Sequence, residues 1–136
     1  MGFGDGLYRA GASPALKSYA GQAIAWKISP EGKLLRKEGH EDSWHEIQLP
    51  VSATLHSLAS NNLDVWVGGA PLSGELSGAL FHTTDGGEHW QRVTGPWAGD
   101  VIALQTNGSQ HNLLSVRTAA GEWQTQDAGV NWVRTR

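Results

Sequence analysis

Residues 78–90 read GALFHTTDGGEHW and residues 121–132 read GEWQTQDAGVNW, and these two stretches decide the fold. Both contain the pattern Thr-x-Asp-x-Gly-x-x-Trp, which we call the box. A degraded copy, GKLLRKEGHEDSW at 32–44, keeps the opening glycine, two leucines and the closing tryptophan. The closing tryptophans are 46 and then 42 residues apart, a period that indicates one repeated structural unit. The complete boxes consist of Thr83, Asp85, Gly87 and Trp90, and of Thr125, Asp127, Gly129 and Trp132.

Short apolar segments of strand type surround each box, and Gly, Asn, Asp and Pro separate them as turn signals. With the strand inside the box, each of the last two repeats holds four short strands. Four antiparallel strands per repeat are the blade of a β-propeller. We therefore expect an all-β chain of about three four-stranded blades. The expected strands outside the boxes lie at 54–60, 63–69, 90–94, 100–106, 112–118 and 132–136, and the expected blades cover 22–50, 51–97 and 98–136.

The first blade is expected to lack its innermost strand. It has apolar segments at 23–29 and 44–49, but residues 13–23 read SPALKSYAGQA. Ser13 and Pro14 suit the start of a short helix, and an extended edge strand fits this segment almost equally well. We therefore assign residues 1–21 to a leader of one of these two kinds.

Composition excludes several classes of protein. The 136 residues have a mass of 14.6 kDa, which suits one domain, and the formal charge of -3 argues against an electrostatic nucleic-acid binder. No apolar run approaches the ~20 residues of a membrane span, and the first residues do not resemble a signal peptide. The absence of cysteine excludes disulfides and thiolate metal sites. We expect no cofactor.

The residues of the box predict a structural role. The Asp carboxylate can accept hydrogen bonds from backbone N–H groups of its own turn, and the Gly permits a positive φ. The Trp ring can bury a large apolar area between blades. Asp85-Gly86-Gly87-Glu88 also offers two carboxylates to a cation, but a calcium loop needs more ligands. The six histidines show no zinc-ligand spacing, so we expect no metal site.

The box resembles the Asp-box of BNR-type propellers. With DVWVGG at 64–69 before it, GALFHTTDGGEHWQRV resembles the Ycf48-like family of photosystem II assembly and stability factors. The resemblance covers roughly residues 22–136. It implies a propeller that binds proteins and does not catalyse a reaction, with the Asp-box at the blade periphery. By the same analogy, a location outside the cytoplasm is favoured.

Two other functions stay open. Asp-box propellers include sialidases, whose chemistry needs three converging arginines, a tyrosine nucleophile and an acid. Arg92 and Arg134 occupy matching outer positions, and only Arg117 is expected to face a ligand. A sugar-binding lectin is the third hypothesis, since Trp97 lies in a Pro/Gly loop outside the repeat. Trp97 and Arg117 are therefore the candidate ligand or partner contacts.

Three blades are too few for a closed propeller, which needs at least ~4. The terminal blades would then expose apolar faces and unpaired edges. Two copies joined around a twofold axis would cover these faces, and we favour such a homodimer. The chain as a fragment of a longer protein, or a half-ring covered by its own leader, are the alternatives.

Overall fold

The structure is a computed structural model that describes residues 24–39, 41–61, 63–107 and 110–136, and the expected helix or edge strand at 13–23 lies outside these residues. The described residues form eleven strands and no helix, so none of them belongs to a helix able to cross a membrane. The strands are β1 (Ile24–Ile28), β2 (Leu34–Glu38), β3 (His45–Glu46), β4 (Leu55–Asn61), β5 (Asp64–Pro71), β6 (Gly78–Thr83), β7 (Gln91–Arg92), β8 (Ala103–Asn107), β9 (Gln110–Thr118), β10 (Gly121–Thr125) and β11 (Val133–Arg134).

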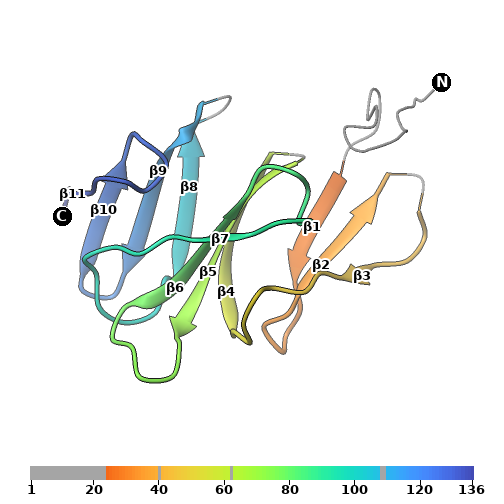
Figure 1. Ribbon diagram of the computed structural model, residues 1–136, viewed down its shortest axis with the longest axis horizontal. Helices are drawn as coiled ribbons and strands as arrows, with labels where there is room; N and C mark the ends of the chain where they lie inside the picture. Colours follow the sequence, from red (N-terminus) through yellow and green to blue (C-terminus); the bar gives the residue numbers. More distant parts are fainter. Residues whose placement is uncertain (1–23, 40, 62, 108–109) are drawn as a thin grey trace. The chain divides into compact units, whose positions relative to one another are not determined.

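These strands make three antiparallel sheets, which are the blades of a partial β-propeller (Figure 1). The sheet orders are β1-β2-β3, β4-β5-β6-β7 and β8-β9-β10-β11. The expected all-β class is therefore confirmed, and both complete repeats contain the four strands that the sequence predicts. The first sheet has three described strands.

The chain divides into two compact units, and each is described by itself. One unit comprises residues 1–25 and 36–45, and its described part carries polar contacts at close range. Arg36 pairs with Glu38 at 3.2 Å, and the Lys37 ammonium lies 5.3 Å from the centre of the Trp44 ring. The other unit comprises residues 26–35 and 46–136 and contains both four-stranded sheets.

In the larger unit, the two four-stranded sheets pack side by side, with β4 next to β8 (Figure 1). Period-two alternation turns one face of each sheet towards the other, so that aromatic and aliphatic side chains fill the space between them. The buried members of this core are Trp66, Leu80, Val93, Trp97, Val101, Leu114, Val116 and Trp123. Ser57 ties the sheets together from a buried position, because its Oγ donates to the carbonyl of Val101 at 2.9 Å.

One polar cluster lies within this largely apolar environment. The His82 ring stacks on Trp66 with ring centres 3.8 Å apart, and its Nε2 lies 2.8 Å from Asp64 Oδ1. His82 and Trp66 are direct partners on β6 and β5, which explains the stacking. The pair thus belongs to the packing of the middle sheet.

Candidate functional site

The box of residues 83–90 forms the turn between β6 and β7. Thr83 Oγ1 donates to Asp85 Oδ1 at 2.7 Å and accepts from the backbone N–H of Gly87 at 3.1 Å. Asp85 Oδ1 also accepts from the backbone N–H of His89 at 3.0 Å. Gly86 and Gly87 both have a positive φ, at 74° and 94°. The two side chains therefore satisfy the backbone donors of a sharply turning segment.

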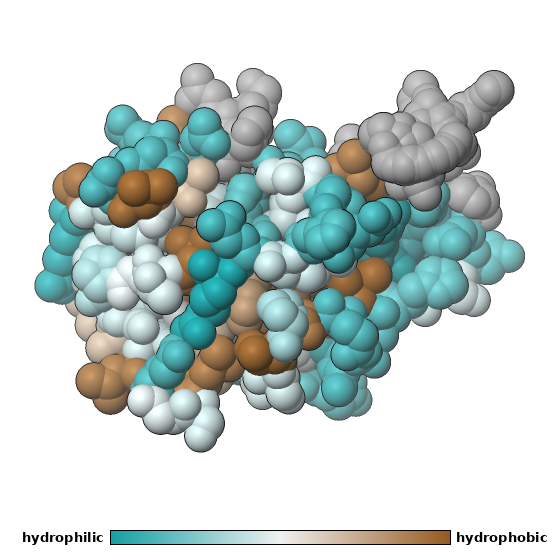
Figure 2. Space-filling model, in the orientation of Figure 1, coloured by the Kyte–Doolittle hydropathy of each residue, from teal (hydrophilic) through white to brown (hydrophobic). Residues whose placement is uncertain are grey.

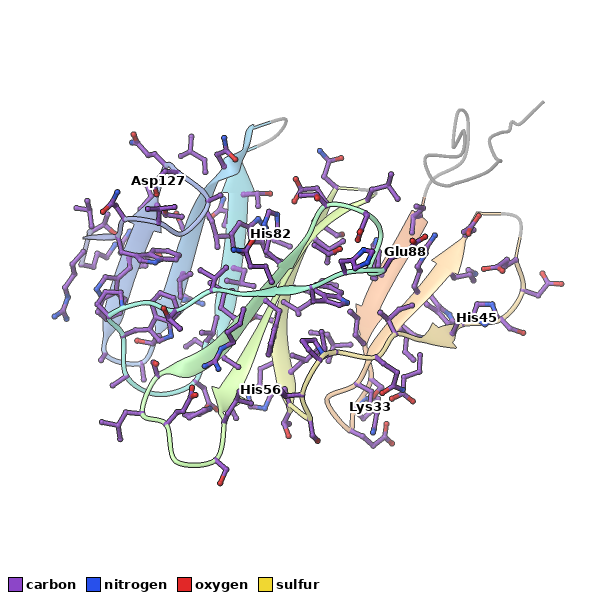
Figure 3. The ribbon with its side chains drawn as sticks, viewed as in Figure 1. Lys33, His45, His56, His82, Glu88 and Asp127 are labelled. Atoms are coloured by element: carbon purple, nitrogen blue, oxygen red, sulfur yellow. The ribbon has the colours of Figure 1, made fainter. Side chains whose placement is uncertain are left out.

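The box of residues 125–132 has the same geometry between β10 and β11 (Asp127 is labelled in Figure 3). Thr125 Oγ1 donates to Asp127 Oδ1 at 2.7 Å and accepts from Gly129 N–H at 2.9 Å. Asp127 Oδ1 accepts from Asn131 N–H at 2.9 Å. Ala128 stands at the position of Gly86 and adopts a φ of 58°, which is uncommon for a residue with a Cβ. The geometry thus repeats although the residues differ.

The two turns differ in what faces the second carboxylate oxygen. The His89 ring Nδ1 lies 2.7 Å from Asp85 Oδ2, whereas Asn131 Nδ2 donates to Asp127 Oδ2 at 2.8 Å. Burial alone would raise the pKa of Asp85, but hydrogen bonds from His89 and Thr83 outweigh it and lower the pKa. The hydrogen bond to Asp85 raises the pKa of His89. Of the two turns, the first therefore pairs its carboxylate with a titratable imidazole and the second with an amide.

The carboxylate of the second box, Asp127, also has a lowered pKa. The backbone N–H of Asn131, then the Thr125 hydroxyl and the Asn131 side chain, lower the pKa of Asp127 to about 2. Both carboxylates are thus occupied by donors from their own turns. Within the described ranges, no group of three His, Asp or Glu side chains is placed to hold a metal ion.

The closing tryptophans pack where each turn returns to the sheet. Trp132 Nε1 donates to the carbonyl of Thr94 at 3.1 Å, which links the last sheet to the segment after β7. Trp90 Nε1 is buried, and no described residue accepts its hydrogen. Gly129 also lies between the sheets, because a Cβ added there would meet Val93 Cγ1 at 2.4 Å.

Trp97 does not fit the role of a ligand contact. Its side chain is 3% exposed, and its Nε1 donates to the carbonyl of Gly78 at 3.0 Å. It meets Trp132 edge to face at 4.9 Å between ring centres. The Pro/Gly loop suggested an exposed aromatic residue, but the core between the two sheets takes up the ring. This correction removes the residue on which the lectin hypothesis depended.

Two of the arginines are engaged within the chain. Arg92 pairs with Glu75 through both ends of its guanidinium group, and this contact lowers the pKa of Glu75. Arg134 donates to the carbonyls of Ala120 and Arg136 and lies over the Trp123 ring. Both are therefore parts of the sheets' own packing. Tyr8 and Tyr19 lie outside the described residues.

Arg117 is the sequence-predicted candidate that remains at an open surface. It is exposed on β9, and no described residue bonds to its guanidinium group. Arg117 lines a hollow of about 270 Å³ on the outer face of the last sheet. A second hollow of about 230 Å³ shares two lining residues with the first, Gln105 and Ser115. The two hollows are lined by Ala103, Leu104, Gln105, Thr106, Leu113, Leu114, Ser115, Arg117, Glu122 and Gln124.

The repeat register shows how unusual this face is. In the middle sheet Trp66 lies opposite His82, and Gly68 lies opposite Leu80. Aligning the boxes places Ser115 and Gln124 at the first pair of positions, and Arg117 and Glu122 at the second. The buried apolar residues Trp66 and Leu80 are thus replaced by Ser115 and Glu122. We call this face, with its residues Gln105, Ser115, Arg117, Glu122 and Gln124, the polar flank.

The polar flank corrects one expectation. The terminal blade was expected to expose an apolar face, but the described end of the unit carries amide, hydroxyl and charged groups. On the face shown in Figure 2, too, apolar residues form small patches between polar ones. The expected blade positions pointed to Arg117 alone, although alignment of the boxes also brings out its four neighbours.

Comparison with known proteins supports the fold. No protein-family model matches the sequence, and no curated protein matches it at a significant level. Among solved structures, Ycf48 bound to D1 peptide is similar, with a TM-score of 0.67, 19% identity and coverage of 82% of this chain. An ancestral GH74 enzyme has a TM-score of 0.51 at 18% identity over 81% of this chain. The chain spans 36% and 18% of these two chains, so it corresponds to a part of each.

Proposed function

We propose that this chain is a protein-binding module without catalytic activity, and that it binds a polypeptide partner on the polar flank. The observation that carries the proposal is Arg117, whose guanidinium group bonds to no described residue and lines an open hollow beside Ser115 and Glu122. An arginine with free donors recognises carboxylate or carbonyl groups through paired hydrogen bonds. The similar structure of Ycf48 is bound to a peptide, which supports a partner of this class.

The two boxes are proposed to be structural Asp-boxes. Their carboxylates and hydroxyls bond to backbone groups of their own turns, as a scaffold requires. The second box connects β10 and β11 of the sheet on which the polar flank lies. On this proposal, changing an Asp-box residue lowers stability and leaves the affinity of the folded protein for its partner unchanged.

A peptide array tests the proposed function. The chain is incubated with immobilised peptides of varied sequence, and bound peptides are titrated with wild-type protein and with two variants. Arg117→Gln should weaken binding by about 10-fold or more, because a charged hydrogen bond contributes about 1.5–3 kcal/mol. Gln126→Glu changes the net charge equally and should bind as the wild type does. Absence of any peptide ligand, or equal loss in both variants, would contradict the proposal.

A glycosidase stays the second candidate, because the GH74 enzyme shares the fold. Glycoside hydrolysis needs two carboxyl groups placed across one bond. Asp85 and Asp127, the carboxylates that recur in the repeats, accept hydrogen bonds from backbone N–H groups of their own turns. Release of a fluorophore from a panel of fluorogenic glycosides would favour the enzyme over the binding module.

Self-association is also proposed, as a homodimer. The polar flank implies that such a dimer uses a different surface, since an isologous contact there would bring polar groups together without an apolar core. Light scattering should give twice 14.6 kDa for the dimer. A monomer mass at high protein concentration would reject it.

A further inference from the structure

A hollow of about 210 Å³ lies beside the linker that joins the first sheet to the middle sheet. One wall is the turn between β1 and β2, where Lys33 is labelled in Figure 3, and the other is the chain that follows β3. Lys33 and Glu46 form an ion pair of 3.7 Å beside it, which leaves this border without net charge. All the residues that line this hollow belong to the larger unit.

The linker has an exact counterpart between the middle and last sheets. Ile47 N–H donates to the Leu34 carbonyl at 2.9 Å, and Val93 N–H donates to the Leu80 carbonyl at 2.9 Å. This alignment superimposes Leu-Pro-Val at 49–51 on Gly-Pro-Trp at 95–97. It also superimposes Gly32 on Gly78. The two linkers therefore leave their sheets through the same anchoring bond.

In the second linker, the chain fills the corresponding place with its own indole. Trp97 is buried in one core with Leu80, Val93 and Val101, and its Nε1 donates to the Gly78 carbonyl. The residues at the matching positions of the first linker are Leu34, Ile47, Leu55 and Gly32, and all four line the hollow. At the position of Trp97 stands Val51, which is 46% exposed. The residues that match the neighbours of Trp97 in its linker and in the preceding sheet are thus present without an indole.

The chain's own linker cannot supply the ring in the same way. A Cβ at Gly95 would lie 2.0 Å from the Trp97 ring, so Trp97 depends on the glycine two residues before it. In the first linker, this position is occupied by Leu49. Residues 1–23 contain no tryptophan either. The first linker therefore gives the hollow no indole of its own.

We propose that this hollow is an anchor site for a tryptophan side chain of a protein partner. The Gly32 carbonyl, the counterpart of the Gly78 carbonyl, is the acceptor for the indole N–H. It already accepts from Leu55 N–H at 3.0 Å, but a carbonyl oxygen has two lone pairs. A cavity of ~150 Å³ can hold benzene, so the volume suits a single bicyclic ring, whereas whole ligands need roughly 300–1,000 Å³. Aromatic anchors in such pockets dominate many protein interfaces.

The site rests on the proposed protein-binding function but lies apart from the polar flank, so the two can be tested separately. The probe is N-acetyl-tryptophanamide, followed by amide NMR shifts of isotope-labelled protein. Saturable shifts should be centred on residues 32–34 and 46–55, with a dissociation constant of about millimolar for so small a ligand. Arg117→Gln should leave this binding unchanged even if it abolishes peptide binding. N-acetyl-alaninamide should cause no such shifts.

The decisive variant copies the second linker into the first. Leu49→Gly with Val51→Trp should fill the hollow, weaken probe binding at least about 10-fold and show a new indole N–H resonance protected from exchange. Val130→Trp adds a tryptophan at an exposed valine of the second box and should keep wild-type probe binding. If the double variant does not fold, Val51→Asp takes its place in the test. This change at an exposed position should leave the fold intact and weaken probe binding. Binding that survives both changes at the linker, or no saturable shifts in the wild type, would overturn the proposal.

Discussion

Replacing Gly129 by alanine tests the packing of the second box against the middle sheet. Gly129 has a φ of 94°, which costs a residue with a Cβ about 1 kcal/mol or more. The added Cβ would also meet Val93 Cγ1 at 2.4 Å, and Val93 is buried with a stiff, β-branched side chain. Overpacking of this kind costs about 1–3 kcal/mol. We therefore expect Gly129→Ala to lower the free energy of unfolding by about 2–4 kcal/mol.

Urea denaturation measures this loss. The m value of a small protein is about 1–3 kcal/mol/M, so the midpoint should fall by at least about 0.7 M. Gly74→Ala is the matched control, because Gly74 has a φ of 81° but nothing lies within 4 Å of an added Cβ. It should cost only about 1 kcal/mol. In a Val93→Ala background, the penalty of Gly129→Ala should shrink to the same value. Equal losses for Gly129→Ala and Gly74→Ala in the wild-type background would refute the proposed clash.

Three further substitutions probe the boxes and the contact between sheets. Gly86→Ala copies Ala128 into the first box and should cost no more than about 1 kcal/mol in urea denaturation. Because the pKa of His89 is raised in the folded protein, its contribution to stability is complete below the ordinary pKa of 6.5 and is lost as the pH rises through the raised value. Because the pKa of Asp85 is lowered, its contribution is lost only as the pH falls below the ordinary pKa of 3.8. The difference in urea midpoint between wild type and His89→Asn should therefore change from pH 6 to pH 8.5, and a constant difference would contradict this. Ser57→Ala should cost about 1–2 kcal/mol by leaving the Val101 carbonyl unpaired, while the exposed Ser60→Ala should stay within about 0.5 kcal/mol.

The sequence predicted the strands well because their signals are local. Alternating apolar residues set the face of each strand, and Gly, Asn and Asp mark the turns between them. The carboxylate and hydroxyl of each box bond within five residues of chain, so the spacing of Thr83, Asp85 and Gly87 was sufficient to predict side chains that bond within their own turn. Such contacts need no knowledge of how the sheets pack together.

Trp97 shows where this kind of reasoning fails. Its neighbours Gly95, Pro96, Ala98 and Gly99 are typical of an exposed loop, and they predicted an accessible ring. Yet Gly95 is small because the Trp97 ring lies against it, and the ring's partners come from both sheets. The burial of a loop residue depends on these distant contacts, which no local pattern contains. The polar flank is a different case, because the sequence does contain the pattern that identifies it. The pattern emerges when the strands that precede each box in the chain are aligned with one another.

Departures from the repeat, rather than the repeat itself, carry the functional proposals. Positions that obey the repeat, such as Thr83 and Thr125, bond to their own turns and have no free groups to offer a partner. Where Arg117 replaces Gly68, a contact surface becomes a charged one, and where Val51 replaces Trp97, a filled site becomes a hollow. The change at Val51 forgoes the apolar burial that Trp97 contributes at the equivalent position, about 25 cal/mol per Å². A packing position given up at Val51 and a charge placed on a sheet face at Arg117 are the features that the two proposed binding surfaces require.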